Sequence, residues 1–367
     1  MPVVIGQVAS LTGNNPGGTE NRLGAELAVA EINAGQGLLG QDAELLVADD
    51  ETLPAQAIRA YNELVGQKVC AVVGTSFSNA SLAIIPEAEK AAVPYISTGA
   101  ADSQVEPVRA YGFMTPPTAA AVAEQMLRYF RAYGLTRLAL VYDDNSMFAK
   151  SGLEKQTRLA EDYGVEFVHL DKFHVDTTDF GSLWAGVTHA GVDGIMAWAT
   201  GPPAVELVRQ RPGGLPFAMS HGNSNQRFLD AAGEAADGII AAANLGLVAD
   251  ELPASDVAEA ATSFAQTFKA RHGRFPSSYA SDGYAAVKLI AAAVVKAGSD
   301  DPKLVRDALE EVDVVTPQGR YRYSATNHYG LNADQVAVTV IRDGRFFLTG
   351  WSSKELAQEA NHHGRSS

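Results

Sequence analysis

The first 100 residues alternate between strand-like and helix-like segments, and this alternation constrains the fold more than any other feature of the sequence. The strand-like segments are VVIGQVAS (3–10), AELLVADD (43–50), VCAVVG (69–74) and VPYIS (93–97). Between them lie stretches in which apolar residues recur with helical spacing. Strands joined through helices predict a parallel sheet built with right-handed crossovers. Runs without polar alternation, such as VCAVVG, suit strands that are buried on both faces.

A second alternation occupies the middle of the chain. The strand-like segments there are RLALVY (137–142), VEFVHLDKF (165–173), VDGIMAWA (192–199), LPFAM (215–219) and GIIAAAN (238–244). Helix-like segments again separate them, so the pattern predicts a second doubly wound sheet.

The last third of the chain returns to helical spacing over residues 251–311 and ends in QVAVTVIRDGRFFLTG, a predicted hairpin that turns at Asp343-Gly344. The predicted fold class is α/β, with two doubly wound parallel-sheet lobes joined by a three-strand hinge. We place the crossovers near 114–118, 244–253 and 332–336. The predicted lobes are both discontinuous: 1–117 plus 250–333 for the N-terminal lobe, and 118–249 plus 334–367 for the C-terminal lobe.

Composition excludes several classes of protein. The 367 residues carry a formal net charge of −15, which opposes binding to nucleic acid. No apolar run approaches the roughly 20 residues of a membrane helix. The start, MPVVIGQVAS, has neither a basic segment nor a long apolar one, so we expect a cytosolic chain or a mature form that has lost an export signal. The single cysteine, Cys70, sits in an apolar strand, and packing is the favoured role.

The motifs typical of catalysis and cofactor binding are not met. GQGLLG (35–40) matches G-x-G-x-x-G, but it follows a helix and precedes a strand, whereas dinucleotide binding needs the opposite order. The histidines show no zinc spacing, and Asp49-Asp50 is best interpreted as a turn at a strand end. No nucleophile, base and orienting group come together in the sequence, so we predict no enzyme activity, no cofactor and no metal site.

Small polar residues follow two neighbouring strands in the first half. VVGTSFSNAS (72–81) places Ser76, Ser78 and Asn79 ahead of a helical stretch, and ISTGAAD (96–102) places Thr98 and Gly99 after the next strand. Such residues either cap a helix without a ligand or, with the exposed N–H groups of the helix, receive an anion such as a carboxylate. Two such loops side by side favour the anion site.

The second half carries a matching set of candidates. Phe148 follows RLALVY, Trp198 and Thr200 end the VDGIMAWA strand, and His221 follows LPFAM in the stretch FAMSHGNSN. Phe148 and Trp198 are either faces for ligand stacking or core residues. His221 is a titratable group at a strand end, where open α/β sheets place their ligands.

The ordered segments VVIGQVASLTG, RLGAELAVAEINAGQGLLG, VVGTSFSNAS, VPYISTGAADS, DDNSMFAKSGL and PSSYASDGYAAVKLI resemble those of type I periplasmic binding proteins. Over nearly all of the chain, the resemblance is to the branched-chain amino-acid binding subfamily of ABC-transporter receptors. It implies two α/β lobes that close by a hinge on a small molecule bound in the cleft between them.

The resemblance also assigns residues. It implies that Ser78 and Gly99 hold the ligand carboxylate and that Phe148 and Tyr279 pack on the ligand. Ala101 stands where the family usually has threonine, which puts one carboxylate contact in doubt. The full predicted ligand-binding set is Ser76, Ser78, Asn79, Thr98, Gly99, Ala100, Phe148, Trp198, Thr200, His221 and Tyr279.

The sharpest departure from the family is His221. Amino-acid binders of the subfamily keep an acidic residue there to pair with the ligand ammonium, and their tyrosine-like partner is replaced here by Thr200 or Gly201. An imidazole cannot be an anion. We therefore predict a carboxylate ligand without an α-amino group, best an aromatic acid of the hydroxybenzoate or phenylpropenoate type.

Three alternatives remain. An amino acid could bind with Asp102 or Asp282 as the ammonium partner, the chain could be a ligand-sensing receptor domain of the same fold, or it could be an enzyme. The resemblance implies ABC-transporter permease subunits as partners, a monomeric state, and a periplasmic or membrane-anchored extracellular location.

Overall fold

The chain divides into two compact units. The computed structural model describes residues 1–13 and 17–363. Unit 1 comprises Met1–Thr118 and Ala260–Leu331, and unit 2 comprises Ala119–Glu259 and Asn332–Ser367. The second crossing falls later than the predicted residue 249 because the 3-10 segment Leu245–Glu251 packs into unit 2, where Leu245 and Val248 share an apolar cluster with Leu348.

Unit 1 contains a five-stranded parallel sheet in the order β2-β1-β3-β4-β5. The strands are β1 (Val3–Ala9), β2 (Ala43–Asp49), β3 (Ala71–Val73), β4 (Tyr95–Ser97) and β5 (Gly112–Met114). The first four lie where the alternation predicts them. The three-residue β5 was missed because, unlike the equally short β3 and β4, it does not lie in a longer apolar run such as VCAVVG or VPYIS.

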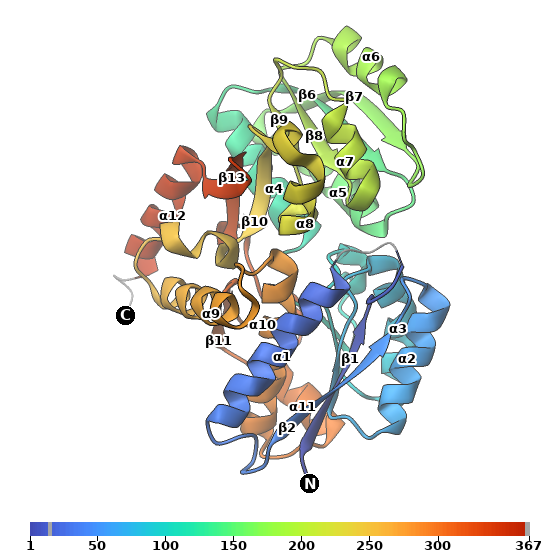
Figure 1. The fold of residues 1–367 in the computed structure, drawn as a ribbon, viewed down its shortest axis with the longest axis vertical. Helices are drawn as coiled ribbons and strands as arrows, with labels where there is room; N and C mark the ends of the chain where they lie inside the picture. The colour runs from blue at the N-terminus through green and yellow to red at the C-terminus, as the bar shows by residue number, and fades with distance from the viewer. Residues whose placement is uncertain (14–16, 364–367) are drawn as a thin grey trace. The chain divides into compact units, whose positions relative to one another are not determined.

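Helices cover both faces of this sheet (Figure 1). Successive residues of β1 point to opposite faces, so Val8 packs with α2 and α3 and Ile5 packs with α1 and α10. The helices of unit 1 are α1 (Gly18–Ala34), α2 (Pro54–Gly66), α3 (Ser78–Ala91), α10 (Ser278–Ala297) and α11 (Pro302–Leu309), and α9 (Asp256–His272) begins in unit 2 and continues into unit 1.

Helix α10, from the last third of the chain, packs closely against α1 because glycines lie at the contact. A Cβ on Gly24 would lie 1.8 Å from the carbonyl oxygen of Ala280, and one on Gly283 would lie 2.0 Å from that of Asn21. Helices α1 and α10 therefore touch backbone to backbone, which only glycine permits.

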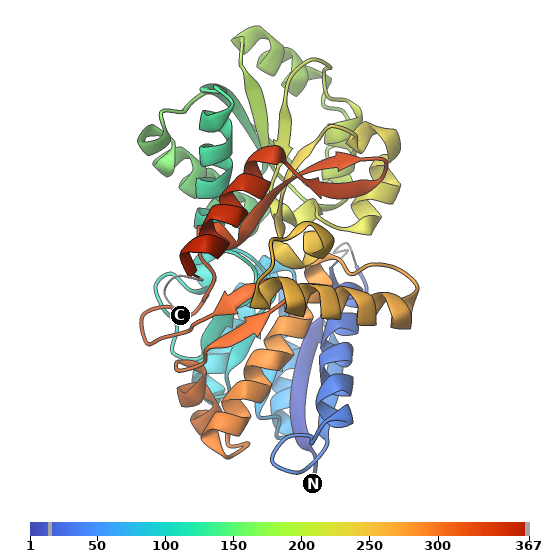
Figure 2. The same cartoon turned by 90° about the vertical axis from the view of Figure 1, so that its left-hand side faces the viewer.

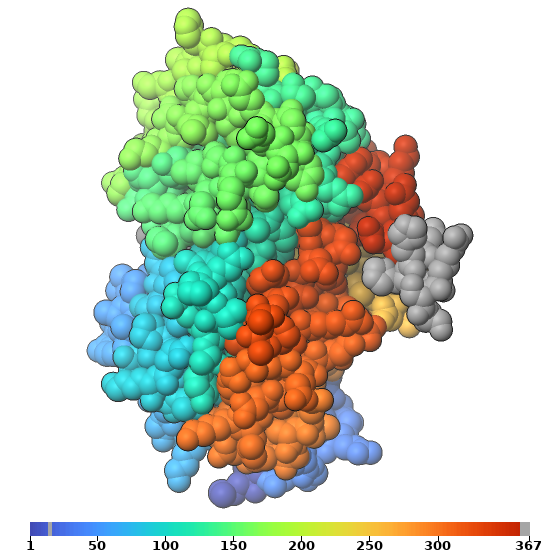
Figure 3. All heavy atoms as spheres, turned by 180° about the vertical axis from the view of Figure 1, so that it is seen from behind, coloured from blue at the N-terminus to red at the C-terminus, as the bar shows by residue number. Residues whose placement is uncertain are grey.

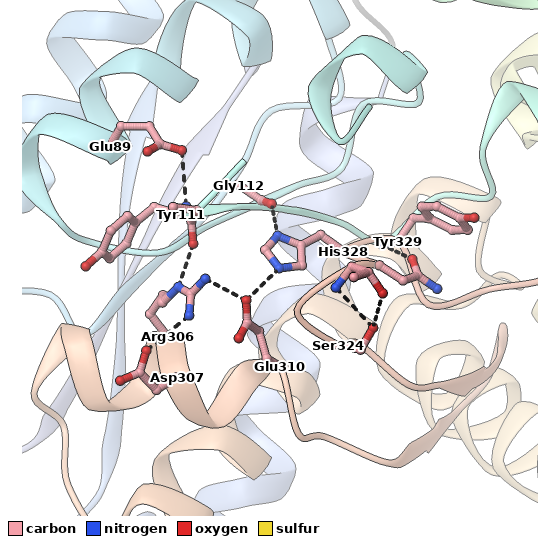
Figure 4. Close-up of polar contacts among 12 residues, drawn as sticks. Glu89, Tyr111, Gly112, Arg306, Asp307, Glu310, Ser324, His328 and Tyr329 are labelled. Atoms are coloured by element: carbon pink, nitrogen blue, oxygen red, sulfur yellow. Dashed lines mark hydrogen bonds and ion pairs between the residues drawn. The ribbon is translucent and has the colours of Figure 1, made fainter. Parts of the chain in front are cut away.

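A buried histidine covers the outer edge of β5 (Figure 4). The Nδ1 atom of His328 lies 2.8 Å from the carbonyl oxygen of Gly112, and the backbone oxygen of His328 accepts from the N–H of Met114 at 2.9 Å. Its ring stacks on Phe113 at 4.0 Å, and its Nε2 lies 3.1 Å from a carboxylate oxygen of Glu310. The segment around His328 thus satisfies edge groups that a sixth strand would otherwise bind.

This coverage joins distant parts of the sequence on one surface of unit 1. Residues near 100–118, in blue-green, and residues near 300–330, in orange, lie side by side in the space-filling view (Figure 3). The short hairpin of β11 (Val314–Thr316) and β12 (Gly319–Tyr321), which sequence analysis missed, belongs to this segment.

Unit 2 contains a seven-stranded sheet in the order β14-β13-β10-β9-β8-β6-β7. Strands β6 to β10 pair in parallel, and β13 is antiparallel to both β10 and β14. The predicted hairpin is confirmed: β13 and β14 are joined through Asp343 (φ 49°) and Gly344 (φ 67°), as a tight two-residue turn requires. The strands are β6 (Arg137–Asp143), β7 (Glu166–Phe173), β8 (Gly194–Trp198), β9 (Phe217–Met219), β10 (Ile240–Asn244), β13 (Val336–Arg342) and β14 (Arg345–Leu348).

Helices α6, α7 and α8 cover one face of the unit 2 sheet, and α4 and α5 pack on the other. Their bounds are α4 (Ala119–Ala132), α5 (Met147–Leu159), α6 (Gly181–Ala190), α7 (Gly201–Arg209) and α8 (Gln226–Ala232). The expectation that the chain ends in the hairpin is wrong, because α12 (Gly350–His363) follows β14, as Figure 2 shows. Among the described residues, no helix combines the length and apolar character needed to cross a membrane.

Candidate functional site

The first polar loop of unit 1 leads directly into α3. Ser78 is buried and is the first residue of that helix, Asn79 is the second, and Ser76 is partly exposed. None of the three stands at the N-cap position, which belongs to Phe77, and the Phe77 side chain makes no capping hydrogen bond. A helix start without a side-chain cap directs backbone N–H groups and the positive end of the helix dipole outward, which favours an anion.

Gly99 lies against this helix start. A Cβ on Gly99 would be 3.0 Å from Oγ of Ser78 and 3.1 Å from its backbone nitrogen. The two predicted carboxylate-binding positions, from the ends of β3 and β4, are therefore brought together. Ala100 is almost buried and Ala101 is fully buried, so Ala101 points into the protein.

Thr98 is used inside unit 1. It is 2% exposed, and its Oγ1 lies 2.8 Å from the carbonyl oxygen of Gly74 and 3.0 Å from Oδ1 of Asn21. We therefore expect Thr98 to fix the loop rather than to contact a ligand.

Gln104 organises the same loop and was missed by sequence reasoning. It is fully buried, its Nε2 donates to the carbonyl oxygens of Gly99 at 2.9 Å and Ala101 at 3.0 Å, and its Oε1 accepts from Ser97 at 2.6 Å. The only signal in the sequence is a glutamine a few residues after a polar loop, which is too common to single it out.

Tyr279 stands near the start of α10. Its carbonyl oxygen accepts from Nδ2 of Asn21 at 2.6 Å, and its ring lies close enough to Gly17 that a Cβ there would be 2.7 Å away. Burial raises the pKa of the Tyr279 phenol, so the hydroxyl stays protonated. The ring is partly exposed and remains a candidate for packing on a ligand.

The two acids considered as ammonium partners are both buried. Asp282 is 3% exposed and accepts a hydrogen bond from Gln318. Burial raises the pKa of Asp282 well above its ordinary value, which favours the neutral acid. Asp102 is 2% exposed in the 3-10 segment Asp102–Gln104. A neutral carboxyl does not compensate an ammonium, so Asp282 fits the amino-acid alternative poorly.

In unit 2, Phe148 on α5 lies between two other rings. It meets Trp198 edge-on at 5.3 Å between ring centroids and His221 at 5.4 Å with an interplanar angle of 88°. Such edge-to-face pairs are a favoured aromatic arrangement. The three residues come from α5, the end of β8 and the segment after β9, which the parallel sheet brings to one edge.

Trp198 is the innermost of the three rings. It is fully buried, its indole N–H donates to Oε1 of Gln156, and a Cβ on Gly152 would lie 2.0 Å from the ring. The structure therefore places Trp198 in the core behind Phe148, and we expect it to support that ring rather than to touch a ligand.

The segment carrying His221 closes tightly over Thr200. Thr200 is partly exposed at the N-cap of α7, and a Cβ on Gly222 would lie 2.4 Å from its Cγ2. Asn223 fixes the segment by donating from Nδ2 to the carbonyl oxygen of Ala199 at 2.8 Å. Gly222 and Asn223 were not predicted as site residues. Both act through contacts with Ala199 and Thr200, which follow a different strand and are distant in sequence.

His221 is buried without a charged neighbour. It is 6% exposed, and burial alone lowers its pKa from 6.5 to about 4, so the ring is neutral at pH 7. Its Nδ1 has no hydrogen-bond partner among the described residues, and neither has Oγ of the preceding Ser220, which is fully buried. Buried polar atoms normally have partners, so this adjacent pair needs an explanation.

The remaining candidates are unremarkable. No group of three or more His, Cys, Asp or Glu side chains suited to a metal occurs in the part of the chain that the structure describes. Asp49 accepts from the N–H of Leu11 and the hydroxyl of Thr12, as the turn interpretation expects. Cys70 is buried, and its thiol pKa is raised by burial to about 12, consistent with packing.

Comparison with known proteins identifies the family. Residues 2–345 match the family described as periplasmic binding protein. This chain belongs to that family. It is a type I periplasmic binding protein of the kind that includes the branched-chain amino-acid receptors, as the resemblance in the sequence implied.

Three known proteins illustrate the relationship of this periplasmic binding protein to others. The leucine-, isoleucine-, valine-, threonine- and alanine-binding protein of Pseudomonas aeruginosa is 25% identical over 82% of this chain and 80% of its own length. The substrate binding protein LivJ of Streptococcus pneumoniae, solved with isoleucine, is 25% identical with a TM-score of 0.83, covering 94% of this chain and 98% of its own. A solute binding protein of an ABC transporter from R. palustris, solved with benzoate, is 20% identical with a TM-score of 0.82, covering 95% and 96%.

These relatives define the general role of this periplasmic binding protein. It is a solute-binding receptor of the ABC-transporter type, from a family whose members bind small ligands outside the cytoplasm and work with transporter permeases.

Proposed function

We propose that this receptor binds a small aromatic carboxylate that carries no α-amino group. The observation that carries the proposal is His221, a buried and neutral imidazole at the strand end where the family resemblance places an ammonium-pairing acid. The carboxylate end of the ligand is assigned to unit 1, and the ring end to Phe148 and its neighbours in unit 2. Contact of one ligand with both units, through a hinge at the three chain crossings, is part of the proposal.

The charge argument concerns the ammonium. Removing an ammonium from water without a partner costs several kcal/mol, and breaking a buried ion pair by deleting one partner costs about 3–5 kcal/mol. A neutral imidazole offers one acceptor and no negative charge. The pKa of His221 is lowered by burial alone, with no charged group contributing. His221 would therefore supply no compensating charge to the ammonium of an amino-acid ligand.

The carboxylate argument concerns the start of α3. Phe77 supplies no side-chain cap, and Gly99 lies within van der Waals distance of Ser78. Backbone N–H groups at a helix start are suited to a carboxylate. Unit 1 therefore keeps an anion-binding element of the kind that amino acids and simple acids both need.

The benzoate-bound protein from R. palustris supports the aromatic part of the proposal at the level of the fold. It shows that a chain of this architecture accommodates a ring with a carboxylate. Phe148 and Tyr279 are the rings in this chain that we assign to such a ligand.

A second candidate is a branched-chain or other aliphatic amino acid, which the names of the Pseudomonas and Streptococcus relatives favour. It would require an ammonium partner other than His221.

Matched ligand pairs test the proposal. Leucine and 4-methylpentanoate differ only by the ammonium group, and benzoate and benzamide differ by the carboxylate charge. Isothermal titration of the purified chain should give tighter binding of 4-methylpentanoate than of leucine and of benzoate than of benzamide, each by ten-fold or more, because about 1.4 kcal/mol corresponds to a factor of ten. Tighter binding of leucine than of every simple acid would refute the proposal in favour of the second candidate.

A further inference from the structure

The end of β9 in unit 2 presents two buried polar atoms that have no hydrogen-bond partner among residues 1–13 and 17–363. These are Oγ of Ser220, on a residue that is fully buried, and Nδ1 of His221, on a residue that is 6% exposed. Other polar side chains of the same segment are satisfied: Ser224 donates to the carbonyl oxygen of Ala242 at 2.6 Å, and Asn225 accepts from the N–H of Phe228 at 2.9 Å. Within residues 220–225, the lack of partners among the described residues is therefore confined to Ser220 and His221.

Strand geometry places Ser220 beside the aromatic group. The register pairs Met196 with Ala218 and Ala197 with Met219, and the N–H of Ser220 donates to the carbonyl oxygen of Ala197. Continuing that register puts Ser220 level with Trp198, on the face of the sheet where α5 packs. Side chains alternate between faces along a strand, so Ser220 shares a face with Trp198 and with Phe148 beside it.

The two residues together define what they can bind. A serine hydroxyl both donates and accepts, and a neutral imidazole has one donor and one acceptor. A ligand carbonyl would need both groups to donate, and an ammonium would need both to accept. A hydroxyl group suits either tautomer of the imidazole, because it can donate to one partner and accept from the other.

We infer that Ser220 and His221 form a subsite for an uncharged hydroxyl group on the ligand, so that the substrate class is hydroxylated aromatic acids, such as phenolic acids, rather than unsubstituted ones. This inference rests on the proposed function for the carboxylate and the ring, and it adds the substituent. The ring of Phe148, edge-on to His221, is the apolar surface next to this subsite.

The experiment compares affinities for acids that differ by one hydroxyl: benzoate with 4-hydroxybenzoate and with 3-hydroxybenzoate, and cinnamate with 4-hydroxycinnamate. We expect at least one hydroxylated acid to bind wild type about ten-fold or more tightly than its parent, since a site built to bond a hydroxyl disfavours the analogue that lacks it. Ser220→Ala and His221→Phe should bring that ratio close to one.

The matched control is Ser224→Ala. Ser224 is equally buried and lies in the same segment, but its hydroxyl already has a partner. This variant should lower the melting temperature and leave the affinity ratio unchanged. His221→Gln, which keeps a neutral donor and acceptor, should retain part of the ratio and guards against misfolding of His221→Phe.

The pH dependence separates the two protonation states of the histidine. For a neutral imidazole, the ratio should stay constant between about pH 5.5 and about pH 8. A ratio that falls as pH rises would show that an imidazolium holds the ligand and would overturn the inference.

The outcomes distinguish the inference from the function on which it rests. If hydroxylated and parent acids bind equally well, or if Ser220→Ala and His221→Phe both leave the ratio unchanged, the hydroxyl subsite is refuted while the aromatic-acid function stands. If no aromatic acid binds and leucine does, both are refuted.

Discussion

Two polar loops at strand ends, one in each unit, look alike in sequence and differ in their hydrogen bonds. After β4 in unit 1, Ser97, Thr98 and Gln104 are all buried and all bonded within the unit. After β9 in unit 2, Ser220 and His221 are also buried, yet each has a polar atom that lacks a partner in the part of the chain that the structure describes. Because burying an unsatisfied polar group costs free energy, residues of the first kind stabilise the fold and those of the second kind are candidates for a ligand.

The comparison changes which predicted residues matter. Thr98 and Trp198 were predicted as ligand contacts, and in the structure both are buried with their polar atoms engaged by neighbours. His221 was predicted on the strength of a resemblance, and its environment gives an independent reason to keep it. The hydrogen-bond partners of a buried residue thus distinguish structural residues from ligand-binding candidates, which the residue type alone does not.

Gln104→Leu should have the largest effect. It keeps the approximate volume and removes one hydrogen bond each from the Gly99 carbonyl, the Ala101 carbonyl and the Ser97 hydroxyl, each of which keeps another partner. With about 1 kcal/mol for each buried hydrogen bond that is lost, we expect the free energy of unfolding to fall by about 3 kcal/mol. Urea denaturation measures it. A loss below about 1 kcal/mol would mean that the unit 1 polar residues do not stabilise the loop, and the comparison would lose its basis.

The burial of His221 should appear in the pH dependence of stability. Burial lowers its pKa from the ordinary value of 6.5 to about 4 in the folded protein, so between these values the unfolded chain binds a proton that the folded chain does not. Stability should therefore rise as pH increases through this window and level off above it, with a total on the order of 3 kcal/mol at about 1.4 kcal/mol per pKa unit.

The measurement for His221 is the free energy of unfolding against pH for wild type and for His221→Gln. Subtracting the two profiles removes the contribution of the other titrating groups. If the free energy of unfolding depends on pH in the same way in the two proteins, the pKa of His221 is the same in the folded and unfolded chains. The surroundings of His221 would then be polar and accessible to water.

Ser81→Ala and Ser220→Ala form a matched pair, since both serines are fully buried. The Ser81 hydroxyl lies 2.6 Å from the Tyr95 hydroxyl and 2.9 Å from that of Ser97, so we expect its loss to cost about 2 kcal/mol. Ser220→Ala removes a group without a partner and should change stability by less than about 0.5 kcal/mol. Thermal unfolding of the two variants checks the difference, and equal losses would show that Ser220 has a structural role.

Gly222→Ala should have the smallest effect of the destabilising changes. Its Cβ would lie 2.4 Å from Cγ2 of Thr200, and such overpacking costs about 1–2 kcal/mol. In a Thr200→Ser background that methyl group is gone, so the cost should shrink, which a double-mutant cycle by urea denaturation would show. If Gly222→Ala does not change the stability in either background, the segment adjusts freely. The lack of partners for Ser220 and His221 would then no longer indicate a ligand-binding role.

Much of the fold followed from periodicity. The strands that alternate with helices in both halves lie where apolar runs predicted them, and the Asp343-Gly344 turn formed as expected, because local backbone preferences suffice there. Strand β5 and the hairpin of β11 and β12 were missed, because these short strands do not lie in longer apolar runs like those that carry β3, β4 and β9. Helix α12 was missed because the hairpin looked like the end of the ordered chain.

Only part of the candidate site could be predicted from the sequence. Sequence located the polar loops after β3, β4 and β9, since strand ends are readable from apolar runs. It could not find Gln104 or Gly222, whose roles depend on the Gly99 carbonyl and the Thr200 methyl group, contacts that no local pattern encodes.

The sequence by itself determined the order of strands and helices, the positions of the polar loops and the place of His221 at the end of a strand. Each of these depends on residues that are neighbours in the chain. Only the tertiary structure decided which buried polar groups have partners. That property depends on distances between segments far apart in sequence, such as Ser97 with Gln104 or Phe148 with His221. It is also what makes the imidazole of His221 neutral, since burial by the surrounding segments lowers its pKa.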